Sequence, residues 1–300
     1  MITGQIGIFA LGTGSSVYLE LDLRAGSTPL QLVQALASIR EPRTTVGGVN
    51  LVSGFRPELW RGLAPNDIPA DVTGFNDAIT GPDGFTLPAT QHDAVLWLAG
   101  SEYDVLFDEA RSAIHALAGV ATVANEMSGW PYDRYRDLTG FIDGTENPSL
   151  LEAPEVVLIP PGTPGAGGTI LLLQKWPHDS AAWEVLSVKA QEDVIGRTKP
   201  DSIELDPRPH DSHVARTDQD TFGNVFRRNM PFGTVSEHGT IFVGFCAKQE
   251  PLATMLESMV GRDGGVRDAL TRYTHAATGA YYFIPAAQTL AQYAQDDAGQ

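Results

Sequence analysis

Residues 140–148, Gly-Phe-Ile-Asp-Gly-Thr-Glu-Asn-Pro, form the strongest local candidate for chemistry. An aspartate among glycine and other turn formers ordinarily bonds to its own backbone in a turn. However, Asp143 and Glu146 place two carboxylates close together with no lysine or arginine between them. The stretch also precedes a segment rich in Pro and Gly, residues 151–168, which is typical of a linker. Because ligands often bind where domains meet, Asp143 is a candidate site residue.

A second candidate is residues 227–233, Arg-Arg-Asn-Met-Pro-Phe-Gly. The ordinary interpretation is the solvated end of a strand. The sharper interpretation is a site for an anion or a developing oxyanion, since arginine stays charged and donates hydrogen bonds in a fork. Asn229 would add an amide to such a site.

Histidine and cysteine limit the metal chemistry. None of the seven histidines forms the HExxH pair of a zinc helix. His210 and His213 are close in sequence, but Pro207 and Pro209 make a helix there unfavourable. The single cysteine, Cys246, excludes an intrachain disulfide and any four-cysteine metal site. A redox metal bound by one histidine would need a macrocycle for its other ligands, and haem provides one.

The apolar pattern predicts the elements that would position these residues. Alternating or continuous apolar runs predict strands, and apolar spacing of three to four residues predicts helices. Strands are expected at 16–23, 94–99, 169–174 and 240–245, and helices at 29–39, 103–117, 181–186 and 252–260. Corresponding strand regions in the two halves lie 153 and 146 residues apart. We therefore predict a duplicated α+β fold, with units 1–150 and 151–300, each an antiparallel sheet with helices on one face.

Composition excludes other classes of protein. The 300 residues include 20 Lys+Arg and 37 Asp+Glu, a formal charge of −17, which argues against a nucleic-acid surface. Hydrophobic residues make up 42%, as in a globular chain. There is no run of 18 apolar residues, and the first basic residue is Arg24, so we expect a cytoplasmic protein without a leader or a membrane span.

Taken together, these segments resemble the dye-decolorizing peroxidase family, and most closely its short bacterial branch, the P-class or B-type. Residues 140–148 match the family's GxxDG signature. Further matching stretches follow in the family's order: 91–93, 174–176 with 178–179, 195–199, 211–216, 227–233, 268–273 and 278–283. The resemblance implies tandem ferredoxin-like units, with haem b held in the second unit near the joint.

The resemblance also implies a role for each site residue. His213 would bind the haem iron, with Asp268 on its other ring nitrogen. Asp143 would move a proton on peroxide, Arg227 would stabilise negative charge, and Asn229 would orient peroxide or water. The full set of residues expected to bind the cofactor is His213, Asp268, Gly144, Thr145 and Arg216. The expected activity is reduction of hydrogen peroxide and oxidation of dyes, phenols or other one-electron donors.

Several alternatives stay open from the sequence. The main one is a haem-handling protein that stores or transfers haem, or releases its iron, without significant peroxidase turnover. A chlorite-decomposing haem enzyme, a cargo protein of a shell compartment and a glycosidase using two carboxylates are further possibilities. The resemblance suggests a homo-oligomer, from dimer to hexamer. Aromatic residues that could carry electrons outward are Trp130, Tyr132, Tyr135, Tyr281 and Tyr282, although most are expected in the core.

Overall fold

Each half of the chain contains one four-stranded antiparallel unit. The computed structural model describes residues 3–10, 12–39, 48–133 and 136–295. The first unit comprises β1(Ser15–Leu23), α1(Pro29–Ala37), β2(Asn50–Phe55), β5(Ala94–Gly100), α3(Tyr103–Leu117) and β6(Ala121–Gly129). The second has strands β7(Thr169–Pro177), β8(Phe226–Arg227), β9(Met230–Gly233), β10(His238–Cys246) and β11(Ala280–Ile284). Its helices are α5(Ser180–Glu184), α6(Val188–Ile195), α7(His213–Arg216), α8(Gln219–Phe222) and α9(Glu250–Met259).

The two sheets have the same strand order. The first runs β2-β5-β1-β6. In the second, β8 and β9 both pair with β10 and together take one position, so the order is β8/β9-β10-β7-β11. In each sheet the first strand, β1 or β7, is central and pairs with the last two, β5 and β6 or β10 and β11. This is the order of a ferredoxin-like unit. The expected duplicated α+β fold is therefore confirmed. The boundary at residue 150 stays a prediction.

The sheets also join at both edges. Gly129 of β6 pairs with Phe232 of β9, and Phe55 of β2 pairs with Phe283 of β11, so the strand pairings run around a closed ring. Side chains of both sheets meet inside this ring. Tyr18, Trp97 and Phe245 stack there in a row, with ring centroids 5.8 and 5.9 Å apart. This shared core holds the two units together.

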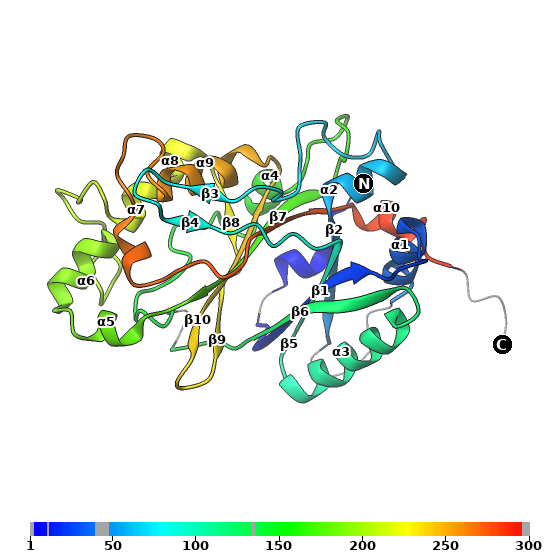
Figure 1. Cartoon of the computed structure of the whole chain (residues 1–300), viewed down its shortest axis with the longest axis horizontal. Coiled ribbons are helices and arrows are strands. Elements are labelled where there is room, and N and C mark those ends of the chain that lie inside the picture. The colour runs from blue at the N-terminus through cyan, green and yellow to red at the C-terminus, as the bar shows by residue number, and fades with distance from the viewer. Residues whose placement is uncertain (1–2, 11, 40–47, 134–135, 296–300) are drawn as a thin grey trace.

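Helices cover the outer faces of the sheets. Figure 1 shows α1 and α3 on the first unit and α5 to α9 grouped around the second. Short elements complete the fold: η1(Ile6–Phe9), α2(Pro57–Leu63), β3(Ile79–Thr80), β4(Thr86–Leu87), α4(Ala153–Val157), η2(Ala269–Arg272) and α10(Ala287–Ala291). The β3–β4 hairpin belongs to the first half but lies against the second, where Arg267 pairs with Asp83 at 3.0 Å. Within the described ranges, no helix has the length and apolar character needed to cross a bilayer.

Local signals explain why most predicted elements formed. Thr28 and Gln31 make a capping box at the start of α1, and the predicted bounds of α3 are those observed. One expectation was wrong. The stretch 151–168 is not only a linker, because α4 forms within it with Pro154 in its first turn, where proline is tolerated. His210 and His213 do not share a helix, as expected, because α7 begins only at His213, after Pro207, Pro209 and the cap residue Ser212.

Candidate active site

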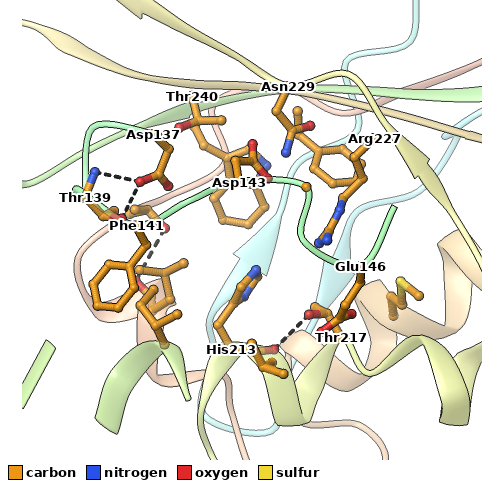
Figure 2. A pocket seen from close by; sticks show the side chains of 18 of the residues that line it. Asp137, Thr139, Phe141, Asp143, Glu146, His213, Thr217, Arg227, Asn229 and Thr240 are labelled. Atoms are coloured by element: carbon orange, nitrogen blue, oxygen red, sulfur yellow. Dashed lines mark hydrogen bonds between the residues drawn. The ribbon is translucent and has the colours of Figure 1, made fainter. Parts of the chain in front are cut away.

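A cavity lies on the outer face of the second sheet. Its volume is about 1270 Å³, part of it open to solvent. Gln174 and Trp176 of β7 and Thr240 and Phe242 of β10 form one wall, because alternate residues of a strand face the same side. The other walls come from α7, α9, β8 and the loop of residues 137–146. Figure 2 shows side chains from these elements converging on the cavity.

His213 projects into the cavity from the start of α7. Ser212 caps this helix by accepting a hydrogen bond from the amide of Ala215. His213 Nδ1 lies 2.7 Å from Asp268 Oδ2, and the ring points toward the opposite wall (Figure 2). Asp268 is fully buried and fixed, since its Oδ1 accepts a hydrogen bond from the amide of Leu270. With Nδ1 engaged, Nε2 is the nitrogen left to bind a ligand.

The charge of Asp268 also acts on His213. Burial lowers the pKa of the His213 imidazole, but the carboxylate of Asp268 and its hydrogen bond raise it by more. The net direction is upward. The Asp268 carboxylate therefore favours the protonated imidazole and holds the ring in one orientation.

Asp143 lies across the cavity from His213 (Figure 2). Its loop depends on Gly140 and Gly144, which have φ values of +87° and +75°, a region that favours glycine. A Cβ at Gly144 would also lie 3.0 Å from the Asn147 amide nitrogen. The glycines of this motif therefore shape the turn that presents Asp143.

Asn147 connects this loop to the strand that carries Arg227. The Asn147 amide donates to the carbonyl of Arg227 and accepts from its backbone N–H, each at 2.8 Å. The Asn147 side chain thus makes the same pair of hydrogen bonds to the backbone of Arg227 that a residue on a neighbouring strand would make. The Arg227 Nε is buried and has no hydrogen-bond partner among the described residues. Figure 2 shows the guanidinium directed into the cavity.

Asn229 completes the group opposite His213. Its Oδ1 accepts a hydrogen bond from the amide of Val243 at 3.0 Å, which leaves its NH₂ group free to donate. The structure therefore brings Asp143, Arg227 and Asn229 together, although Arg227 and Asn229 are more than 80 residues from Asp143 in sequence.

Three charged residues of the wall were missed as site residues. Arg197 pairs with Glu146 at 2.6 Å and donates to the carbonyl of Ser202. Asp137 also lines the cavity, with its carboxylate bonded to Thr139. Arg197 and Glu146 belong to stretches that match the family, so the available signal was the matched motif itself. Asp137 stands just before one such stretch and had no separate signal.

The remaining expected residues have different positions. Gly144 and Thr145 line the cavity, and Asp268 lies behind His213. Arg216 is not among the described residues that line the cavity. Its guanidinium pairs with Asp263 at 3.2 Å and bonds to the Val266 carbonyl, so its expected contact with the cofactor is not supported.

The aromatic candidates divide into two groups. Trp130 and Tyr132 are exposed by 36% and 41%, whereas Tyr281 and Tyr282 are buried. Tyr135 lies outside the described residues. Only the first two are therefore exposed as an outward electron route requires.

The cavity residues fit the haem that the resemblance implies. One imidazole nitrogen is available to bind iron, and Leu252, Met255, Leu256 and Met259 supply an apolar wall from α9. The buried Nε atoms of Arg197 and Arg227 lack hydrogen-bond partners in the described part of the chain, so each could donate to an anionic group. An apolar cavity with few placed polar groups is what a large planar cofactor requires.

Comparison with known proteins identifies the relatives of this chain. The profile of the family Dyp-type peroxidase, C-terminal, matches residues 134–289. A dye-decolorizing peroxidase of Mycolicibacterium paratuberculosis is 37% identical over 264 residues, covering 85% of this chain and 73% of that protein. A dye-decolorizing protein from Vibrio cholerae is 33% identical with a TM-score of 0.86, covering 95% and 98% of the two chains. A variant of Rhodococcus jostii DypB, solved in complex with heme, is 31% identical with a TM-score of 0.86, covering 94% and 96%.

Proposed function

Because this chain belongs to the dye-decolorizing peroxidase family, we propose that its haem peroxidase activity uses haem b bound at His213 and the side chains of Asp143, Arg227 and Asn229. The observation that carries the assignment is one cavity with His213 on one side and Asp143 with Arg227 on the other. When bound, haem supplies the redox-active iron at which peroxide is reduced and donors are oxidised.

The chain's own residues manage protons and charge. Hydrogen peroxide must lose a proton from one oxygen and gain one on the departing oxygen. The Asp143 carboxylate can accept the first proton and then donate it to the departing oxygen. The Arg227 guanidinium stabilises the negative charge that develops on peroxide. The Asn229 NH₂ group orients peroxide or water. On the other side, the Asp268–His213 pair holds the imidazole in the orientation needed to bind iron.

The haem-handling alternative is not favoured. Storage or transfer of haem needs His213 but does not require a carboxylate and a guanidinium facing it. Reduction of peroxide requires both groups, the carboxylate to transfer a proton and the guanidinium to stabilise negative charge. The distinction is measurable, because only a peroxidase sustains turnover with peroxide and a phenol.

The test begins with the visible absorption spectrum of the purified protein. We expect a haem band that His213→Ala abolishes or shifts. Rapid mixing with peroxide then compares the parent protein with Asp143→Ala and Arg227→Leu. Removing one group that stabilises developing charge typically slows a reaction by about 10²–10³-fold. The assignment fails if His213→Ala leaves the spectrum unchanged, or if neither of the other variants slows the reaction.

Further features remain part of the proposal. We expect donors to be small one-electron reductants, with cationic donors favoured by the net charge of −17. A cytoplasmic location and a homo-oligomer of two to six chains are also proposed, on the family resemblance and the sequence. Fractionation of the producing cells and light scattering of the purified protein test these two points.

A further inference from the structure

Asp137 is a second carboxylate on the wall that carries Asp143. It lies six residues before Asp143 and lines the same cavity. Thr139 holds only one of its oxygens, Oδ1, through its backbone amide at 2.9 Å and through its hydroxyl. The other oxygen, Oδ2, has no hydrogen-bond partner in the described part of the chain. Figure 2 shows Asp137 and Asp143 on the same side of the cavity, opposite His213.

No cation among the described residues pairs with Asp137. Neighbouring Arg136 donates to the carbonyls of Gly140 and Lys199, and Lys199 Nζ donates to Gln191. The other titratable or charged groups on the cavity wall are Asp143, Glu146 paired with Arg197, His178, His213 and Arg227. His178 stays neutral in mildly acid solution, because burial and the nearby histidines lower its pKa to about 4.

The surroundings of Asp137 favour its neutral form. Burial raises the pKa of Asp137 to about 6, and the negative charge of Asp143 adds to this increase. The hydrogen bonds from Thr139 and the charge of His213 oppose it. Two carboxylates on the wall of one cavity ordinarily lose their protons in separate steps, since both charges together are unfavourable.

We propose that Asp137 is the proton-holding partner of Asp143, so that its ionisation sets the upper pH limit for reaction with peroxide. This inference rests on the proposed function of the cavity. Peroxide gives one proton to Asp143, and that proton returns to the departing oxygen as water forms. Asp137 therefore neither gains nor loses a proton over a turnover. It acts through Asp143 as a positioning residue. When Asp137 is protonated, peroxide binds beside one carboxylate charge, that of Asp143, and when Asp137 is ionised, it binds beside two.

The experiment uses the haem-loaded protein and rapid mixing with hydrogen peroxide across pH. For a group with a pKa near 6, the protonated fraction falls about tenfold between roughly pH 5 and pH 7. We expect the rate constant to fall by about this factor in the parent protein, and Asp137→Asn to remove the decline. Thr139→Val is the matched variant. It removes a hydrogen bond that favours ionised Asp137, so the midpoint should move to higher pH.

A second measurement avoids turnover altogether. Fluoride binding to the ferric protein also places an anion in the cavity, and its affinity is read from the absorption spectrum. In the parent protein we expect fluoride affinity to decrease as pH rises, with the same midpoint as the rate constant. In Asp137→Asn this decrease should be absent. A purely structural role would change affinity equally at every pH.

The outcomes separate the two proposals. If the parent protein does not react with peroxide at any pH, the proposed function fails. If it reacts, and Asp137→Asn keeps the parent midpoint in both measurements, the inference about Asp137 is overturned. Should Asp137→Asn not bind haem, Thr139→Val decides, because an unshifted midpoint contradicts the inference.

Discussion

Replacing Asn147 by Asp tests how the fold positions Arg227. The parent side chain donates to the Arg227 carbonyl and accepts from its amide, each at 2.8 Å. A carboxylate keeps the shape and the acceptor but loses the donor, so two acceptors would face each other. Leaving a buried acceptor without a partner costs about 1–3 kcal/mol. The loop that carries Asn147 should then move away from β8.

The kinetic effect follows from geometry. A displacement of about 1 Å in a positioned group can slow a reaction by about 10²-fold. We expect Asn147→Asp to slow the reaction with peroxide by about 10–100-fold at saturating haem, measured by rapid mixing. The unfolding free energy, measured in urea, should fall by about 1–3 kcal/mol.

A double-mutant cycle with Arg227→Leu shows whether the effect passes through Arg227. If it does, Asn147→Asp should add little in the Arg227→Leu background. Asn50→Asp provides a matched control, because the Asn50 side chain, on β2, donates a longer hydrogen bond, at 3.4 Å, to the Ala99 carbonyl of β5. The reasoning is refuted if Asn147→Asp slows the reaction equally in both backgrounds, or no more than the control does.

Three further substitutions test other contacts. Arg197→Leu would leave Glu146 unpaired on the cavity wall. Breaking a fully buried pair costs about 3–5 kcal/mol, but these side chains are 14% and 24% exposed, so urea unfolding should show a smaller loss, which Glu146→Gln in the same chain partly restores. Burial raises the pKa of Glu20, while the hydroxyl of Tyr282 at 2.7 Å lowers it. A raised folded pKa means that stability is lost as pH rises through it, so Tyr282→Phe should destabilise the protein more near neutral pH than near about pH 5, and an equal loss at both would contradict this. Asp268→Asn should lower the iron–histidine stretching frequency in resonance Raman spectra, because the proximal imidazole becomes less basic, and an unchanged frequency would count against the pair.

Local sequence patterns determined much of the fold. The alternating residues of β1, the capping residues of α1 and the apolar spacing of α3 each depend on neighbours a few positions away. These signals can be recognised in the sequence alone. The types of the elements and the repeat of their order in the two halves could therefore be predicted. The short helix α4 was missed, because Pro and Gly around it indicate a linker equally well. Motif resemblance then assigned His213, Asp143 and Arg227 to one site.

Only the tertiary structure decided how these residues meet. Asn147 bonds to the backbone of a residue 80 positions away, and Asp268 contacts a histidine 55 positions away. The first contact depends on how the loop that carries Asn147 packs against β8, and the second on how the helices of the second unit pack together. The same packing turned Arg216 toward Asp263 and brought Asp137 to the cavity wall. Sequence spacing specifies which residue types are present and which local turns they form. Burial and the distances between charges arise only when distant segments fold against each other, and they determine what each side chain can do.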